Sequence, residues 1–289
     1  KIRKMKKIIL SFIALIFSLS INAQLDRSVM PVGGPSPKIK LDKPKEFKLK
    51  NGIRVLVVEN HKLPRINYSL RFDRKPIVEG EKTGVISLLG SMLGNGTKSI
   101  PKDDFNEEVD FLGAGINVGF GSGFAFTLTK NNERVLELFS DAVINPLLTE
   151  EEFEKEKDKL IEGLKSQKKD IDAISGRVGD ALSYGKTHAY GEFISEQTIV
   201  NIKFEDILEY HAKYFIPNNV YIVVIGDVNY KEVKSLISEK FGAWKKGKSI
   251  NDPEPILTEN VALTEINFVD LPTATQSSIQ VTNNVNLKM

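Results

Sequence analysis

Residues 49–60 read LKNGIRVLVVEN, and this stretch decides the fold of the chain. Asn51-Gly52 is a strong turn signal, because both residues tolerate the backbone angles that a two-residue hairpin needs. Before this dipeptide, residues 46–50 alternate between polar and apolar side chains. After it, residues 53–59 are rich in valine. The pattern predicts two antiparallel strands joined at Asn51 and Gly52.

Further strands and helices are predicted along the chain. Residues 66–72 alternate like a strand, 115–130 look like a glycine-rich hairpin, and the apolar run 220–225 is typical of a buried strand. Helices are predicted over 82–93, 102–112, 131–144, from Thr149 onward as a long helix, 204–215 and 230–240. Because the strands come mostly in hairpins and the helices are grouped after them, we expect an α+β fold of two layers. In it, helices pack on a mostly antiparallel sheet.

The N-terminus has the three-part layout of a secretory signal peptide. Lys6 and Lys7 form a basic start, residues 8–21 form an apolar run, and Ala23 is a small residue at the end of the segment. An apolar run of this length is too short to span a bilayer comfortably. We therefore expect residues 1–23 to be removed after Ala23, with export to the periplasm and no stable membrane anchor in the mature protein.

Composition divides the remaining residues into four segments. Residues 24–44 are rich in proline and lysine and predict an extended lead-in, and 45–244 hold the main domain. Residues 245–260 are typical of a linker. Residues 261–269 and 276–281 predict two strands of a second domain over 261–289. Since two strands cannot bury a core, we expect this second domain to be truncated.

Charge and cysteine content exclude several classes of function. The formal net charge is +2, but the predicted signal peptide carries five cations and no acid, which leaves 35 basic and 38 acidic residues. The lysines are scattered among acidic residues, so we expect no nucleic-acid partner. The chain has no cysteine, which excludes thiolate metal sites and a cysteine nucleophile.

Several stretches together resemble the pitrilysin/insulinase family of zinc peptidases. The likeness runs from about residue 45 to the end, in an order and spacing similar to the family. It is carried by residues 49–60, 188–191, 214–228 and 268–277. The resemblance implies the α+β fold of that family, which is LuxS/metallohydrolase-like. Residues 261–289 would then begin its second, homologous domain.

The family's zinc signature is missing from the corresponding stretch. The family carries H-x-x-E-H on a helix, where two histidines one turn apart bind zinc and the glutamate is the general base. Here the matching stretch is 84–97, and its flanking residues fix the register. Ser87 and Ser91 then occupy the histidine positions, and Gly90 occupies the position of the catalytic glutamate.

The segment of the third zinc ligand agrees with this interpretation. Residues 153–157 resemble the family's helix, on which two glutamates lie seven residues apart. Glu156 keeps the first, supporting position, whereas Gly163 stands where the metal ligand belongs. With Ser87, Gly90, Ser91 and Gly163 at the four essential positions, we expect no metal site and no catalysis by this chain alone.

No other arrangement of residues predicts a replacement chemistry. His61, His188 and His211 are widely separated in the sequence and lack ligand spacing. The acidic run from Glu150 to Glu156 is typical of a solvated helix start. The glycines of 113–123 do not match a phosphate-binding loop.

One further feature could retain a function. The resemblance implies that residues Gly115, Ile116, Asn117 and Val118 form an edge strand, which in active members pairs with the substrate peptide. Main-chain pairing needs no particular side chains, so it can survive the loss of catalysis. The alternative interpretation is a flexible hairpin with an unused edge.

The resemblance implies a non-catalytic subunit of an exported zinc peptidase. Like the degenerate subunit of mitochondrial processing peptidase, it would bind peptide and complete a chamber with a zinc-bearing partner subunit of the same family. Zinc is then expected only in the partner. Two alternatives stay open: a structural or peptide-binding module without a protease partner, or part of a longer chain whose C-terminal portion carries the zinc site.

Overall fold

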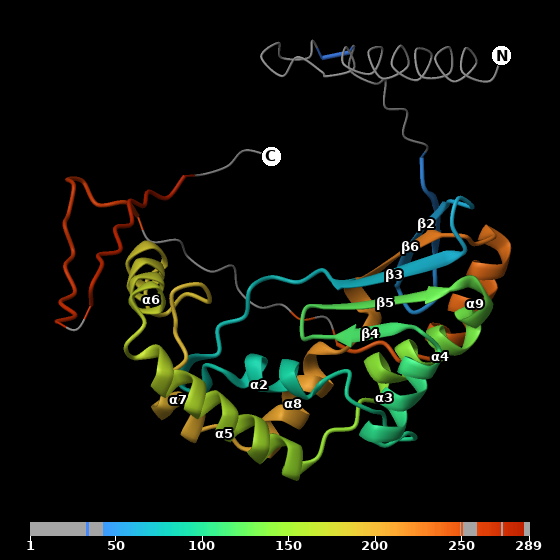
Figure 1. The fold of residues 1–289 in the computed structure, drawn as a ribbon, viewed down its shortest axis with the longest axis horizontal. Coiled ribbons are helices and arrows are strands. Elements are labelled where there is room, and N and C mark those ends of the chain that lie inside the picture. The colour runs from blue at the N-terminus through green and yellow to red at the C-terminus, as the bar shows by residue number, and fades with distance from the viewer. Residues whose placement is uncertain (1–32, 35–42, 249, 251–258, 273, 286–289) are drawn as a thin grey trace, which may run out of the picture. The chain divides into compact units, whose positions relative to one another are not determined.

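A six-stranded sheet in the order β1-β2-β6-β3-β5-β4 organises the protein (Figure 1). The computed structural model describes residues 33–34, 43–248, 250, 259–272 and 274–285. The predicted signal peptide, residues 1–23, lies outside the described residues. Its cleavage stays a prediction.

The strands and helices come in groups along the chain. The strands are β1 (Lys45–Lys48), β2 (Arg54–Glu59), β3 (Arg65–Phe72), β4 (Gly115–Val118), β5 (Ser122–Leu128) and β6 (Val220–Gly226). The helices are α2 (Val85–Met92), α3 (Lys102–Phe111), α4 (Asn132–Ile144), α5 (Glu150–Gln167), α6 (Ile171–Tyr184), α7 (Glu196–Val200), α8 (Phe204–Tyr214) and α9 (Tyr230–Gly242). Short 3-10 turns are η2 (Gly80–Lys82), η3 (Thr129–Asn131) and η4 (Pro217–Asn219).

The sheet is antiparallel except at one pair of strands. β1 pairs with β2, β3 with β5 and β6, and β4 with β5, all antiparallel. β2 and β6 run parallel, with Val55 opposite Ile222. The prediction of an α+β fold with a mostly antiparallel sheet is therefore confirmed. The parallel pair has no local sequence signal, because β6 reaches its place between β2 and β3 only after most of the domain has been traversed.

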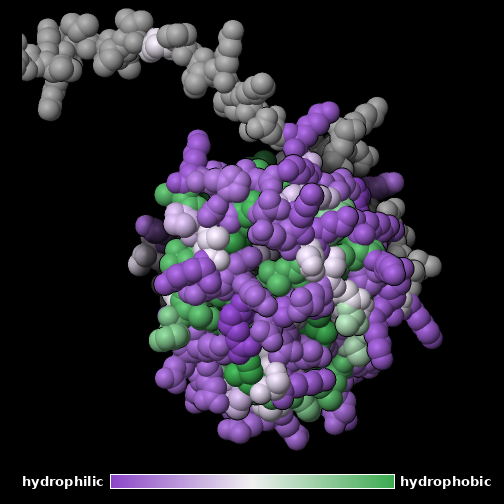
Figure 2. Space-filling model, turned by 90° about the vertical axis from the view of Figure 1, so that its right-hand side faces the viewer, coloured by the Kyte–Doolittle hydropathy of each residue, from purple (hydrophilic) through white to green (hydrophobic). Residues whose placement is uncertain are grey.

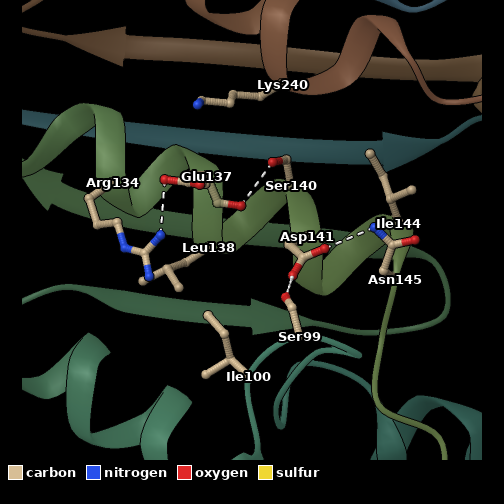
Figure 3. A pocket seen from close by; sticks show the side chains of 10 residues that line it. All are labelled: Ser99, Ile100, Arg134, Glu137, Leu138, Ser140, Asp141, Ile144, Asn145 and Lys240. Atoms are coloured by element: carbon tan, nitrogen blue, oxygen red, sulfur yellow. Dashed lines mark hydrogen bonds and ion pairs between the residues drawn. The ribbon is translucent and has the colours of Figure 1, made fainter.

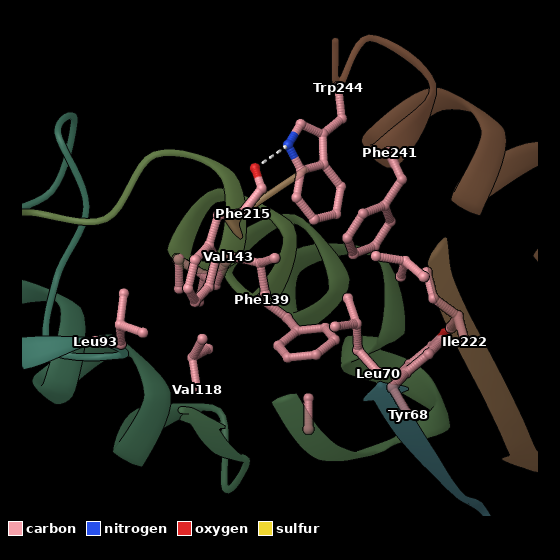
Figure 4. Packing of buried hydrophobic residues seen from close by; sticks show 14 of the residues in the cluster. Tyr68, Leu70, Leu93, Val118, Phe139, Val143, Phe215, Ile222, Phe241 and Trp244 are labelled. Atoms are coloured by element: carbon pink, nitrogen blue, oxygen red, sulfur yellow. Dashed lines mark hydrogen bonds between the residues drawn. The ribbon is translucent and has the colours of Figure 1, made fainter. Parts of the chain in front are cut away.

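Helices cover the sheet face toward which alternate strand residues point. Tyr68 and Leu70 of β3 and Ile222 of β6 are fully buried, and they lie with Phe139 of α4 and Phe241 of α9 in one core (Figure 4). The rings of Phe139 and Phe241 lie 6.2 Å apart, edge to face. The alternation of the strands thus places every second side chain under α4 and α9.

The predicted turn at Asn51 and Gly52 also holds a helix end. Gly52 has a φ of +107°, as a tight turn requires. The side chain of Asn51 is buried and donates to the carbonyl oxygens of Phe241, at 2.7 Å, and Trp244, at 3.1 Å. Phe241 is the penultimate residue of α9 and Trp244 follows the helix, so both carbonyls lie where the helix no longer supplies its regular hydrogen-bond donors. These hydrogen bonds therefore join the hairpin to the end of α9, although Asn51 and Phe241 are 190 residues apart in the sequence.

Two parts of the helix prediction need correction. The helix predicted over 82–93 is broken: η2 ends at Lys82, and α2 begins at Val85 after a left-handed Gly84 with a φ of +113°. Helices α6 and α7 were absent from the prediction. No residue of α6 is buried.

The strands predicted over 261–269 and 276–281 are wrong for this structure. No strand is assigned within described residues 259–285, and the apolar side chains there are exposed, with Ile266 at 92% and Val281 at 95%. A strand needs a neighbour to pair its backbone groups, and the described sheet supplies none here. The division into a linker and a second domain stays a prediction.

The face of the sheet opposite α4 and α9 carries apolar side chains as well. Phe124 and Phe126 of β5 expose 43% and 46%, and Ile225 of β6 exposes 43%. A different side of the molecule, shown in Figure 2, is mainly hydrophilic with small separate hydrophobic areas. Among the described helices, none is both long and apolar enough to cross a membrane.

Candidate functional site

Three of the four positions predicted to be vacated lie on α2. Ser87 and Ser91 are exposed and one helical turn apart, and Gly90 is half-buried between them. The opposite side of α2 is buried through Val85, Leu88, Leu89 and Met92. The hydroxyl of Ser91 donates to the carbonyl oxygen of Leu88 at 2.9 Å, as an exposed helical serine commonly does.

The fourth position lies on a helix that packs against α2. Gly163 is in the second half of α5, and α5 contacts α2. No neighbouring atom lies within 4 Å of the place where a Cβ on Gly163 would stand. Glu156 lies seven residues, about two helical turns, before Gly163 and forms an ion pair with Lys159. The four positions thus lie on two helices, α2 and α5, that contact each other.

The side chains at these four positions do not fit a zinc ion. Zinc in peptidases is bound by imidazole nitrogens and carboxylate oxygens, whereas a neutral serine hydroxyl is a weak ligand and glycine has no side chain. The described residues contain no group of three or more histidines, aspartates or glutamates that could hold a metal. The assignment of Ser87, Gly90, Ser91 and Gly163 to the family's positions stays a prediction from the sequence.

The start of α2 is held by two carboxylates that the sequence analysis missed. Glu79 accepts hydrogen bonds from the backbone N–H groups of Gly84, at 3.1 Å, and Ile86, at 2.8 Å. Glu192 accepts from the backbone N–H groups of Glu79, at 2.8 Å, and Gly80, at 2.9 Å. The bonds to Glu79 satisfy donors at the N-terminus of α2, and the bonds to Glu192 tie the segment before α2 to the loop after α6.

The pKa of Glu79 is raised to about 6, mainly by burial and also by the nearby charge of Glu192, although the backbone hydrogen bonds to its carboxylate lower it. Tyr210 of α8 faces both carboxylates, and its pKa is raised to about 12, mainly by burial. Gly84 is required at this point, because a Cβ there would overlap the side chain of Ile199. A signal existed for this arrangement: an acidic residue shortly before a predicted helix start.

The edge strand β4 lies beside the end of α2. Its only strand neighbour in the described residues is β5. Since Gly119 donates to Ser122 at 2.8 Å, the antiparallel alternation turns the N–H groups of Ile116 and Val118 toward the free edge. A Cβ on Gly94 would stand 3.0 Å from the nitrogen of Val118, so the chain after α2 closes one end of this edge. Ile116 lies two residues before Val118 on the same strand and is half-buried.

Gly90 faces the turn between β4 and β5. A Cβ on Gly90 would stand 3.8 Å from the nitrogen of Phe120 and 4.0 Å from its Cβ. Leu93, just after α2, likewise lies near Val118 of β4 (Figure 4). The vacated positions of α2 and the predicted peptide-binding strand are therefore neighbours.

The three histidines are far from one another and have separate surroundings. His61 is exposed and contacts Asp227 at 2.7 Å. His188 stacks on Tyr184 with ring centres 5.3 Å apart. Burial lowers the pKa of His211 to about 4, and its ring stacks on Phe215. Within the described residues, none of the three belongs to a group that could hold a metal ion.

A pocket of about 290 Å³ lies elsewhere, along α4 and near the end of α9 (Figure 3). Its charged groups are satisfied by protein neighbours. Arg134 pairs with Glu108 at 2.6 Å and with Glu137 at 3.0 Å. Asp141 accepts from Ser99 at 2.7 Å and from Asn145 at 2.8 Å. Because these groups are already paired, the pocket offers no evident chemistry.

Two profiles of one peptidase family match adjoining parts of the chain. The profile described as "Insulinase (Peptidase family M16)" matches residues 76–182, and "Peptidase M16 inactive domain" matches residues 201–285. The chain belongs to the insulinase family. The resemblance stated from the sequence is therefore confirmed, and with it the membership in a family of peptidase folds.

Members of the insulinase family with known names or structures are distant relatives. An uncharacterized zinc protease of Rickettsia felis is 24% identical over 216 residues, which are 71% of this chain and 51% of the relative. A protease structure from Helicobacter pylori matches with a TM-score of 0.65 at 24% identity, over 75% of this chain and 54% of the other. The peptidase M16 inactive domain from Pseudomonas fluorescens matches with a TM-score of 0.65 at 21% identity, over 76% and 54%.

These comparisons cover only part of each relative. The chain spans about half the length of the curated relatives it matches. At such identities the structural matches show the fold alone. Activity, substrate and partners of the whole relatives do not transfer to this chain.

Proposed function

We propose that this chain is a non-catalytic member of the insulinase family that binds peptide on β4 and acts with a zinc-bearing subunit. The observation that carries the proposal is the contrast within α2. The loop before it is held by half-buried carboxylates and a left-handed glycine, whereas Ser87, Gly90 and Ser91 offer no group for zinc chemistry. A scaffold kept in order without its reactive groups favours binding over catalysis.

Peptide binding on β4 is supported by its free edge. The N–H group of Ile116 faces outward and needs no side-chain chemistry to pair with an added strand. The proposed substrate is therefore an extended peptide, recognised through its main chain.

The test uses the purified chain and an insulinase-family peptidase from the same cell that has an intact H-x-x-E-H. Addition of the chain is expected to raise the peptidase's kcat/KM on a labelled peptide, while the chain alone shows no hydrolysis. Ile116→Pro removes one outward donor at the edge and should weaken the effect on KM, whereas Ile116→Ala should not. If neither kcat nor KM of the peptidase changes on addition, the proposal is wrong.

A second candidate rests on the coverage of the relatives. Since the chain matches about half of their length, the zinc chemistry would in this case belong to a further part of the same polypeptide. Reading the gene downstream of residue 289 decides between the two. An in-frame H-x-x-E-H would favour one polypeptide over a separate partner.

We also propose export to the periplasm, on the basis of residues 1–23. N-terminal sequencing of the protein recovered from cells should begin at Gln24. A protein that retains residues 1–23 would contradict the proposal.

A further inference from the structure

Arg74 places a cation beside the vacated positions of α2. It lies two residues after the end of β3, and its guanidinium lies among aromatic rings. The guanidinium carbon is 3.9 Å from the ring centre of Phe120, 4.9 Å from that of Phe72 and 5.7 Å from that of Tyr214. Such rings favour a cation through their negative faces, although they do not neutralise it.

Arg74 makes two hydrogen bonds, both to backbone carbonyl oxygens. One nitrogen donates to Tyr214 at 3.2 Å, and another donates to Phe120. A guanidinium has five N–H groups, so three remain for another acceptor. Within the described part of the chain, no ion pair joins Arg74 to a carboxylate, and the adjacent Asp73 is exposed.

A half-buried guanidinium without an acid is electrostatically costly. Burial lowers the pKa of Arg74 to about 10, and Tyr214 offsets that effect only in part. By contrast, Arg134 pairs with Glu108 and Glu137 and has a raised pKa. A carboxylate that reached Arg74 would form charge-assisted hydrogen bonds in a fork geometry that lysine cannot reproduce.

The position of Arg74 connects it to the proposed peptide site. Phe120 covers the guanidinium on one side and faces Gly90 of α2 on the other. The same residue lies in the turn that follows β4. A peptide that extends along β4 toward this turn would therefore bring one of its side chains, or its C-terminus, near Arg74.

We propose that Arg74 binds a carboxylate of the peptide on β4, so that this chain selects acidic peptides. The inference rests on the proposed function and adds a substrate class to it. Arg74 is then a specificity-determining residue, and the aromatic rings of Phe72, Phe120 and Tyr214 hold its guanidinium in place.

The test measures fluorescence anisotropy with labelled peptides of about ten residues built from serine, valine and threonine. A single glutamate is moved along the sequence, and each peptide has a partner with glutamine at the same place. For at least one position, the chain should bind the glutamate peptide about tenfold more tightly than its glutamine partner. Arg74→Met should remove this difference and leave the affinity for the glutamine peptide unchanged, and Arg74→Lys should retain part of it.

Arg71→Met provides the matched control, because Arg71 is an exposed arginine on β3 three residues earlier. It should keep the full preference for glutamate. Equal binding of both peptides of every pair by the unaltered chain would overturn the role of Arg74 while leaving peptide binding intact. Equal weakening of both peptides by Arg74→Met would assign Arg74 a structural role only. If no peptide binds, the proposed function itself fails.

Discussion

The start of α2 and the exposed side of the same helix differ in how many of their polar groups take part in contacts that the fold needs. At the start, Glu79 and Glu192 accept backbone hydrogen bonds, and Gly84 adopts a left-handed angle in close contact with Ile199. In the middle, the exposed Ser87 and Ser91 flank a glycine. Both regions belong to one helix of eight residues.

This difference separates two kinds of constraint. The start of α2 is constrained by the fold, because buried N–H groups there need acceptors. The middle faces outward, where the side chains are free to change without loss of packing. A helix can therefore keep its place while the groups that would carry zinc chemistry are replaced.

The largest expected effect comes from the start of the helix. Glu79→Ala leaves the N–H groups of Gly84 and Ile86 without their acceptor, which should lower the free energy of unfolding by about 2–3 kcal/mol. Ser87→Ala, on the exposed side of the same helix, should change it by less than about 0.5 kcal/mol. Urea denaturation measures both. Equal effects of the two variants would remove the distinction between the regions.

The dependence of stability on pH sharpens the same comparison. The pKa of Glu79 is raised from its ordinary value of 4.5 to about 6, so the folded protein binds this proton more tightly than the unfolded chain. The contribution is fully present below pH 4.5 and is lost as the pH rises through about 6, a loss of roughly 1–2 kcal/mol. Glu79→Gln keeps an acceptor oxygen and should flatten this part of the profile. Urea midpoints between pH 4.5 and 7 for both proteins give the answer, and an unchanged slope in the variant would contradict the assignment to Glu79.

A smaller effect of opposite sign is expected at the vacated glycine of α5. Gly163→Ala adds a methyl group into open space and improves helix propensity, so it should stabilise the protein by up to about 1 kcal/mol. Gly176→Ala in α6 is the matched control, since Gly176 is also helical and its Cβ would meet nothing within 4 Å. Thermal unfolding should show similar gains for both. A loss of stability for Gly163→Ala alone would mean that the fold needs glycine there.

Local signals predicted much of the fold. The Asn51-Gly52 turn, the alternation of β3 and the cap of α5 by Thr149 each depend on neighbours in the sequence, and each is present in the structure. The parallel pairing of β2 with β6 could not be predicted in this way, because nothing in either strand specifies a distant parallel partner.

The candidate site was predictable only in part. The register of 84–97 located Ser87, Gly90 and Ser91 on one helix, and the structure places α5 against that helix. The acceptors Glu79 and Glu192 are far apart in sequence, so their joint hold on α2 emerges only from the fold. The exposed apolar residues of 261–269 show the reverse case: a strand-like pattern does not form a strand without a pairing partner.

The central claim is that serine and glycine stand where the family's zinc ligands belong. The most direct measurement is zinc content by atomic emission after equilibration with the metal and gel filtration. It compares the unaltered chain with a variant carrying Ser87→His, Ser91→His and Gly163→Glu. We predict no stoichiometric zinc in the unaltered chain and about one zinc ion per chain in the variant, because two histidines one turn apart and a glutamate on the packed helix complete a ligand set. Stoichiometric zinc in the unaltered chain, together with chelator-sensitive peptide hydrolysis, would contradict the account.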